Sequence, residues 1–410
     1  MNIARVTCQV AAAALVMALG GLALTRATHA SSVAAPVVAA HRGGYTDRAE
    51  RDVQIAVWNT ALAADPTSAL VLGQLAALHM QRGREGGTFD EYVEAEKLAR
   101  RSLARRTNHN SGTAATLISA LLAQHRFTDA RTVAADLVAR EPDVAEYRAA
   151  LAEVSMELGD DVAADTLFRS VWASRGTLTI AARLARWLEI NDHVPEARSL
   201  LMAAQADAMQ RRDVATETKA WFALRVGDLE LRRGHLRAAE SAYTKGLVLE
   251  PDDPRLFAAM ARLARERKRY DDVIRWGERA IGMQLDPATL GMVGDAYAMQ
   301  GNAEKADEYF RTLEVAVSMQ PGAYHRAWSL YLLDHGLRVS EVLRRAQDEL
   351  RVRKDVYGYD VVAWALLKAG RRDEARAAMR AALRLNTPDP LLLRHARAMG
   401  LDVTSAQSEA

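Results

Sequence analysis

Residues 220–251 read AWFALRVGDLELRRGHLRAAESAYTKGLVLEP, and this stretch decides the fold. It contains two runs of helix-forming residues separated by Gly234, a residue typical of the break after a helix. Gly227 follows a bulky valine in the first run, while Ala239 and Tyr243 share one face of the second run. A proline, which cannot continue a helix, closes the stretch. The sequence therefore predicts two helices that fold back on each other.

The same pattern recurs along the chain at a nearly constant spacing. The spacing between the small central residues of successive second helices is 33 to 36 residues, apart from one interval of 42. These central residues are Ala95, Ala130, Ala164, Ala197, Ala239, Val273, Ala306, Val342 and Ala375. Small residues also recur where the two helices of a unit are expected to cross, because a bulky side chain there would push the helices apart. They are Gly73, Ala152, Ala185, Gly227, Ala261, Gly294, Ser329 and Ala363.

The period and these positions resemble those of tetratricopeptide repeats, in which each unit is a pair of antiparallel helices. The resemblance implies an all-α fold, a right-handed α-solenoid with about nine repeats and terminal half-repeats. We expect a lone second helix at residues 48–64 and a capping helix at residues 391–399. Within this array the sequence predicts an N-terminal block at 48–204, an extended helix or turn at 205–219, and a C-terminal block at 220–400.

Three irregularities interrupt the repeats. About ten additional residues, rich in glycine and charge, lie near Arg82 to Tyr92 in the first unit. The interval of 42 residues indicates longer helices or a longer turn around residues 205–218, where the superhelix is free to bend. The unit at residues 324–354 matches the pattern poorly, and its register depends on Val342 and two further apolar residues at helical spacing.

The first thirty residues have the composition of a secretory signal. Arg5 precedes an uncharged, mostly apolar run at residues 10–24, and small residues suited to signal-peptidase cleavage end at Ala30. We therefore expect cleavage after Ala30 and a periplasmic or secreted protein of bacterial type, with an uncleaved membrane anchor as the alternative. A flexible leader at 31–47 and a disordered tail at 401–410 complete the predicted organisation, with no membrane span after cleavage.

Cysteine content and charge limit the functions that are possible. Cys8, the single cysteine, precedes the apolar run, so the mature chain would contain neither disulfides nor thiolate metal ligands. Removing Arg5 and Arg26 with the signal leaves 52 basic residues against 52 acidic residues. A neutral chain lacks the strongly basic character of a nucleic-acid binder. We expect no nucleic-acid partner.

The sequence lacks the usual motifs of catalysis and of cofactor binding. It contains no HExxH, no GxSxG, no phosphate loop ending in GK[ST] and no GxGxxG. The histidines are scattered, with no two four residues apart, so we predict no metal site, no cofactor and no catalytic residue. The acidic pairs Asp160-Asp161 and Asp252-Asp253 lie at predicted helix starts, where carboxylates cap the backbone.

The concave side of a helical solenoid is lined by its first helices. Helical phase predicts that the middle units direct Glu153, Arg186, Trp221, Asp228, Arg255, Arg262 and Asp295 inward, and the later units Tyr324, Tyr331, Tyr357, Asp360 and Trp364. Aromatic residues with arginines beside them are typical of binding hot spots, so we predict a groove of Trp221, Asp228, Arg255, Arg262, Tyr324, Tyr331, Tyr357 and Trp364. The alternative is that Tyr331 and Trp364 pack between units. Either Trp221 or Phe222 must face the core.

These features favour a non-catalytic scaffold of the bacterial cell envelope that holds a protein or an extended peptide in its groove. A module for a glycan or another envelope polymer is the second hypothesis, because aromatic faces suit sugars. An enzyme with a site between repeats is the third. The oligomeric state and the identity of the partner are not encoded in any motif of the sequence.

Overall fold

The computed structural model describes residues 48–319 and 325–403, and within these ranges the chain is entirely helical, with no strand. One 3-10 turn, η1 (Trp172–Ser174), accompanies the α-helices. The α-helices are α2 (Arg48–Ala64), α3 (Ala69–Arg84), α4 (Asp90–Arg105), α5 (Ser111–Ala123), α6 (Phe127–Arg140), α7 (Ala145–Leu158), α8 (Asp161–Ser170), α9 (Leu178–Ile190), α10 (Val194–Gln210), α11 (Thr216–Arg232), α12 (Leu236–Leu249), α13 (Pro254–Glu266), α14 (Tyr270–Ile281), α15 (Pro287–Met299), α16 (Ala303–Met319), α17 (His325–Asp334), α18 (Val339–Leu350), α19 (Val356–Lys368), α20 (Arg372–Ala382) and α21 (Pro390–Ala398).

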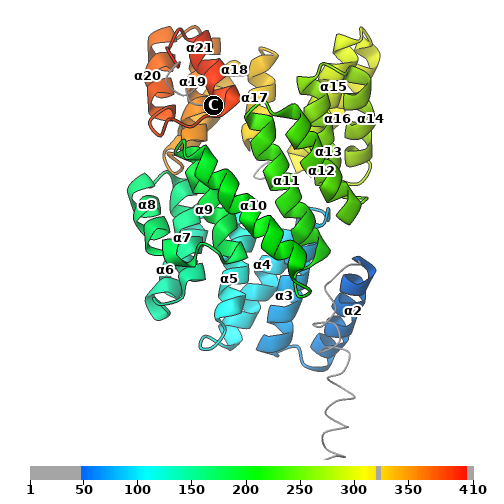
Figure 1. Ribbon diagram of the computed structural model, residues 1–410, viewed down its shortest axis with the longest axis vertical. Coiled ribbons are helices and arrows are strands. Elements are labelled where there is room, and N and C mark those ends of the chain that lie inside the picture. Colours follow the sequence, from blue (N-terminus) through cyan, green and yellow to red (C-terminus); the bar gives the residue numbers. More distant parts are fainter. Residues whose placement is uncertain (1–47, 320–324, 404–410) are drawn as a thin grey trace, which may run out of the picture.

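Among the described residues the helices form nine consecutive pairs, from α3 with α4 to α19 with α20 (Figure 1). Helix α2 precedes the first pair and α21 follows the last. Each first helix packs against its own second helix, and most first helices also contact the next first helix. The predicted all-α solenoid is therefore confirmed, with a number of units that agrees with the prediction. The predicted signal at 1–30, the leader at 31–47 and residues 404–410 of the tail lie outside the described residues.

Small residues set the distance between the paired helices. All nine central residues of the second helices are buried, and none is more than 3% exposed. At the crossing of α11 and α12, a Cβ atom added to Gly227 would lie 2.4 Å from the ring of Tyr243. The same spacing recurs two units later, where a Cβ on Gly294 would lie 2.4 Å from the ring of Phe310. The two rings thus occupy the space that the missing side chains leave.

The acidic pairs at helix starts are caps, as predicted. Asp160 accepts a hydrogen bond of 3.2 Å from the backbone N–H of Ala163 at the start of α8. Asp253 accepts one of 2.8 Å from the N–H of Arg255, with Pro254 in the first turn of α13. Both contacts satisfy backbone donors that have no partner within the helix. The carboxylates therefore start helices.

The three irregular regions have different structures. The additional residues of the first unit lengthen α3 and form the loop at 85–89 before α4. The interval of 42 residues contains two long helices, α10 and α11, and the connecting segment 211–215. The poorly matching unit contains α17 and α18, and Val342 is buried at 2% exposure as its register predicts. The division into two blocks at this interval remains a prediction.

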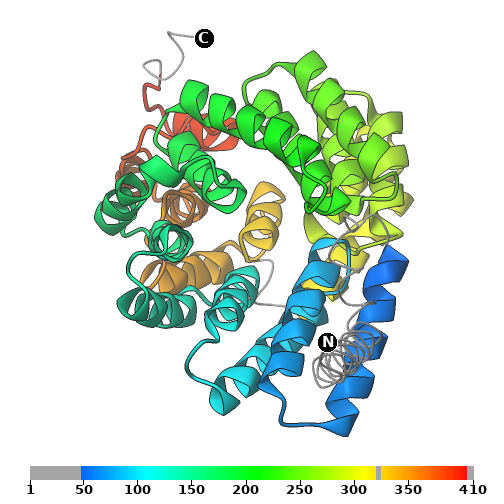
Figure 2. The ribbon, with the colours of Figure 1, turned by 60° about the horizontal axis from the view of Figure 1, so that its bottom comes forward.

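Segments about 200 residues apart in the sequence lie against each other. The superhelix completes one full turn, and the units of its second turn pack on those of the first. Figure 2 shows the ring, and Figure 1 shows α19–α21 above α7–α9. The backbone N–H of Lys354 donates to the carbonyl of Leu158 at 3.0 Å, and Arg353 pairs with Glu157 at 3.0 Å. Thr387 Oγ1 donates to the carbonyl of Ile190 at 2.7 Å.

A second contact between turns joins the N-terminal helices to the middle of the chain. Arg48 donates to the carbonyl of Asp252 at 2.9 Å, and Gln284 Nε2 donates to the carbonyl of Gly87 at 3.3 Å. The loop that follows α3 is thereby placed beside α13 and α14. The additional residues of the first unit thus supply part of this contact.

The crossing at Gly227 yields a stability prediction. In Gly227→Ala the new methyl group would overlap the ring of Tyr243, whose hydroxyl is held by Asp228 at 2.9 Å. We expect a loss of about 1–3 kcal/mol in the free energy of unfolding, measured by urea denaturation. Gly291→Ala is the control, because Gly291 lies inside α15 with its nearest neighbour at an ordinary 3.6 Å. The control should be neutral or stabilise by up to about 1 kcal/mol, and equal losses in both variants would contradict the packing argument.

The contact between turns yields a second prediction, at Gly159. This residue has φ +74°, and a Cβ would lie 2.3 Å from the carbonyl carbon of Lys354. Gly159→Ala should therefore accelerate amide hydrogen exchange in residues 351–368, which are distant in sequence. Gly234→Ala is the matched control, because Gly234 has φ +76° with nothing within 4 Å of its Cβ position, so it carries the same backbone cost without the contact. Unchanged exchange at 351–368 in Gly159→Ala would show that packing between the two superhelical turns does not depend on the close approach of Gly159 to Lys354.

Candidate functional site

The candidate site is the concave face, defined here as the side of the first helices α7 to α19 that carries the residues predicted to point inward. Its middle part lies on α9, α11 and α13. Trp221 is half-buried there, whereas Phe222 is 1% exposed and belongs to the core. The two rings meet edge to face at 5.1 Å, and the guanidinium of Arg225 lies 6.0 Å from the Trp221 ring centre. Of the two adjacent aromatics, Trp221 is therefore the accessible one.

Asp228 and Arg262 join neighbouring units on this face. Their side chains pair at 2.9 Å between α11 and α13, and the hydroxyl of Tyr243 donates to the same carboxylate. Burial alone would raise the pKa of Asp228, but the guanidiniums of Arg262, Arg225 and Arg232 hold it below its usual range. The carboxylate thus stays ionised and fixes the position of Arg262.

Arg255 lies at the beginning of α13 and is compensated by two carboxylates. It pairs with Glu217 on α11 at 2.8 Å and with the cap residue Asp253 at 2.6 Å. With two acidic partners, this predicted groove residue links two units, and its guanidinium has little capacity left for an anion. Its side chain is nevertheless 21% exposed.

The predicted aromatics of the later units are held by packing. Tyr331 packs against Phe310 of the preceding unit with ring centres 5.3 Å apart, and Trp364 stacks on His395 of α21 at 4.1 Å. Both remain half-buried, so the expectation that they pack between units describes their contacts well. Tyr324 lies outside the described residues.

Tyr357 differs from the sequence prediction. Its ring is 9% exposed and lies between the guanidiniums of Arg186, at 5.2 Å, and Arg326, at 4.6 Å. Arg186 belongs to the fourth unit, so Tyr357 is buried in the contact between turns and is not open to solvent in a groove. The cause is the packing of the second turn on the first, which no local sequence pattern encodes.

The structure brings together a cluster of arginines that the sequence prediction included only in part. Glu189 on α9 is 6% exposed and accepts a hydrogen bond from Arg225 at 2.9 Å and another from Arg232. Arg186 lies 3.9 Å from the same carboxylate. Helical spacing could have identified the two further members of this cluster. Glu189 lies three residues after Arg186, and Arg232 lies four residues after Asp228, so each shares a helix face with a residue predicted to point inward.

A buried histidine lies next to the later part of the face. His395 Nδ1 is 2.7 Å from Asp360 Oδ1, and Arg326 pairs with Asp360 at 3.2 Å. Asp360 is fully buried, and Trp364 covers the imidazole ring. These three polar side chains connect α17, α19 and α21. They account for the burial of Asp360, which the sequence predicts to point into the groove.

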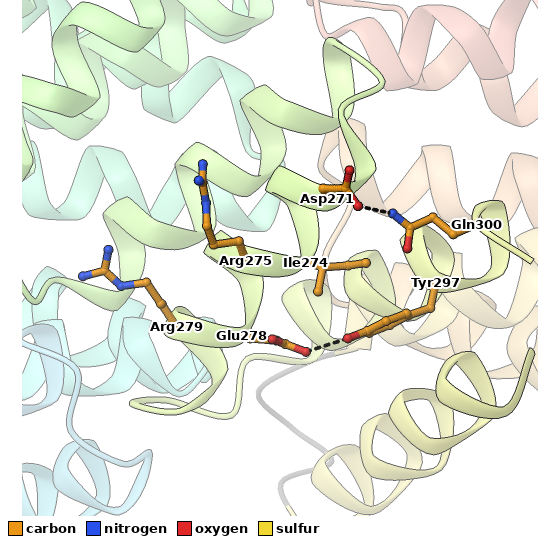
Figure 3. Close-up of a pocket in the computed structure, with 7 residues that line it drawn as sticks. All are labelled: Asp271, Ile274, Arg275, Glu278, Arg279, Tyr297 and Gln300. Atoms are coloured by element: carbon orange, nitrogen blue, oxygen red, sulfur yellow. Dashed lines mark hydrogen bonds between the residues drawn. The ribbon is translucent and has the colours of Figure 1, made fainter. Parts of the chain in front are cut away.

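The opposite, convex side of the ring carries a hollow of about 610 Å³. It lies between α14 and the end of α15, and Figure 3 shows the side chains that line it. The hydroxyls of Tyr297 and Tyr309 both donate to Glu278 Oε1, at 2.8 Å each. Burial and the hydrogen bond to this carboxylate raise the pKa of Tyr297 to about 12, so the phenol stays protonated. No pattern in the sequence predicts this hollow.

Two further observations concern the described residues alone. They contain no group of three or more histidine, cysteine, aspartate or glutamate side chains placed to hold a metal ion. None of their helices combines the length and the apolar character that crossing a membrane requires.

Comparison with known proteins identifies the repeats. A family model described as a tetratricopeptide repeat matches residues 116–171, 224–289 and 363–401. No curated protein sequence is significantly similar to the chain.

Several solved structures follow a similar path. The APC/C hetero-tetramer Cut9–Hcn1 aligns with a TM-score of 0.46 and 13% identity over 75% of this chain, which spans 52% of that chain. PilW, a widely conserved type IV pilus biogenesis factor, aligns with a TM-score of 0.42 and 18% identity over 53% of this chain and 97% of that one. The human IFIT1 dimer with m7Gppp-AAAA aligns with a TM-score of 0.47 and 14% identity over 83% of this chain and 87% of that one.

Proposed function

Since the chain is a tetratricopeptide-repeat protein, we propose that it is a non-catalytic scaffold that holds a protein or an extended peptide on its concave face. The observation that carries this proposal is the row of partly exposed side chains on consecutive first helices. Trp221, Arg225, Arg262 and Arg265 belong to this row. Tryptophan and arginine are the residues that most often dominate the binding energy of protein interfaces.

The rigidity of this row favours binding. Trp221 is held at its inner edge by Phe222, and Arg262 is held by Asp228. Side chains that are already ordered lose little conformational entropy when a partner binds. An extended peptide could place its side chains against successive first helices without any rearrangement of the helices themselves.

We also propose that the protein acts in the bacterial cell envelope, after export directed by residues 1–30. Support comes from the charge and composition of these residues, with Arg5 before an apolar run and small residues up to Ala30. Mass spectrometry of protein purified from the envelope fraction should find a mature N-terminus at Ser31. Recovery of chains that begin at Met1 in the cytoplasmic fraction would contradict export.

The binding proposal predicts the effect of Trp221→Ala. Loss of the indole should lower the affinity for the retained partner about tenfold or more, which is typical of a hot-spot tryptophan. The measurement is a pull-down from an envelope extract, followed by titration of the partner that is retained. Trp172→Ala is the matched control, because Trp172 is 43% exposed in the 3-10 turn and lies outside the first helices. Equal binding by wild type and Trp221→Ala would contradict a role for the concave face.

The hollow on the convex side supports a glycan as a second candidate ligand. Its charges balance, with Asp271 and Glu278 against Arg275 and Arg279, and Tyr297 supplies an aromatic ring. Balanced donors and acceptors beside an apolar surface suit a neutral, hydroxyl-rich molecule. A neutral oligosaccharide should then raise the melting temperature of wild type and of Trp172→Ala but not that of Tyr297→Ala. An identical shift in all three proteins would exclude binding at this hollow.

A further inference from the structure

We propose that the segment bound on the concave face is acidic and that it docks on an arginine cluster in the middle of that face. The cluster consists of Arg186 on α9, Arg225 and Arg232 on α11, and Arg262 and Arg265 on α13. This inference rests on the proposed function, since it specifies the chemistry of the partner that the scaffold holds.

The acidic and basic groups of this region lie at different depths. Glu189 and Asp228 are 6% and 18% exposed, whereas the exposure of the five arginine side chains ranges from 16% to 50%. Glu189 therefore forms the base of the cluster, four of the guanidiniums are more exposed than both carboxylates, and Arg225 at 16% is about as buried as Asp228. A ligand that approaches the face meets mainly positive charge.

The positive charge exceeds its local compensation. Arg186, Arg225 and Arg232 surround Glu189, Arg262 pairs with Asp228, and Arg265 lies 3.7 Å from Glu266. All of these residues lie in helices that the structure describes completely. Within 4 Å, five guanidiniums thus face three carboxylates, an excess of two positive charges, while Glu157, Asp286 and Asp295 act on Arg186, Arg262 and Arg265 from a longer distance.

The arginines on either side of the cluster are matched by carboxylates. Arg183 pairs with Glu153 at 2.8 Å, and Arg353 pairs with Glu157 at 3.0 Å and with Asp355 at 2.6 Å. These two flanking arginines therefore add nothing to the excess of positive charge in the cluster.

Like charges are crowded at two of the five arginines, whereas acidic neighbours outweigh burial and raise the pKa of Arg186 and of Arg262. Burial lowers the pKa of Arg225, and the guanidiniums of Arg232 and Arg186 lower it further. Burial likewise lowers the pKa of Arg265, with Arg262 and Arg394 contributing. Carboxylates of a ligand would relieve this repulsion with charge-assisted hydrogen bonds, for which the planar guanidinium is well suited.

The dimensions and surroundings favour a short acidic peptide over a nucleic acid. Packed helices lie about 8–10 Å apart, so the path from α9 to α13 is about 20 Å, the length of about six extended residues. A longer polyanion would meet Glu153 and Asp295 on the neighbouring first helices. Trp221 lies beside the cluster and would contact an apolar residue next to the acidic ones.

The experiment measures fluorescence anisotropy of a labelled peptide of about eight residues, with glutamates interleaved with serines and one leucine at the end. Its counterpart carries glutamine in place of each glutamate. We expect the full-length mature protein to bind the glutamate peptide at least tenfold more tightly than the glutamine peptide. We also expect this binding to weaken several-fold when the salt concentration rises from about 50 to about 200 mM. Equal affinity for the two peptides would overturn the inference.

Variants locate the binding on the protein. We expect the affinity for the glutamate peptide to fall about fivefold or more in Arg265→Gln and in Arg186→Gln. Arg371→Gln, at the N-cap of α20 and paired with Glu374 at 2.5 Å, should leave the binding of this peptide unchanged. Circular dichroism and the melting temperature show whether each variant is folded. Full binding by both concave variants would overturn the inference, as would a single-stranded RNA oligonucleotide that displaces the peptide at lower concentration than unlabelled peptide does.

The same variants separate this inference from the proposed function. If the partner retained from the envelope extract depends on Trp221 but not on Arg186, Arg265 or salt, the scaffold function stands and the acidic character of the partner is wrong. If the glutamate peptide binds through these arginines while no protein is retained from the extract, the chemistry of the cluster is supported and the proposed class of partner fails.

Discussion

At the closest crossings the first helix of a pair approaches the second so closely that no space remains for a side chain. Gly227 against Tyr243 and Gly294 against Phe310 are the tightest examples, since even a methyl group would overlap the ring. This separation determines the angle between the helices of a unit, and small rotations repeated over many units determine the curvature of the array. The position of every residue on the concave face therefore depends on these crossings.

The curvature also brings distant units of the array into contact. A solenoid is usually quasi-one-dimensional, because each repeat contacts only its neighbours. Here Lys354 contacts Leu158, and Thr387 contacts Ile190, about 200 residues away. Unfolding of the last units then costs contacts with the third and fourth units as well as with their neighbours. The array should behave as one cooperative body, with a concave face of fixed shape.

Much of the fold could be predicted from the sequence, because its determinants are local and periodic. Central residues such as Ala130 and Val342 could be identified from spacing alone, and both are buried. The environment of Tyr357 could not be predicted, because it depends on the accumulated rotation of several units that brings Arg186 beside it. The hollow at Tyr297 was missed for a related reason, since the hydrogen bonds of its lining side chains connect three helices. Local patterns thus predict which residues are buried within a unit but not which turns meet.

The side chains that we propose for recognition on the concave face also stabilise the array. Glu189 gathers arginines from two helices and is itself almost completely buried, so it links the units and holds the guanidiniums in place. A carboxylate that compensated every arginine would stabilise the array further but would leave no charge for a ligand. Without any carboxylate, the guanidinium groups would repel one another and the arginine side chains would be disordered. The observed ratio lies between these limits: the buried acids order the arginines, and the remaining positive charge is what we propose a partner would use.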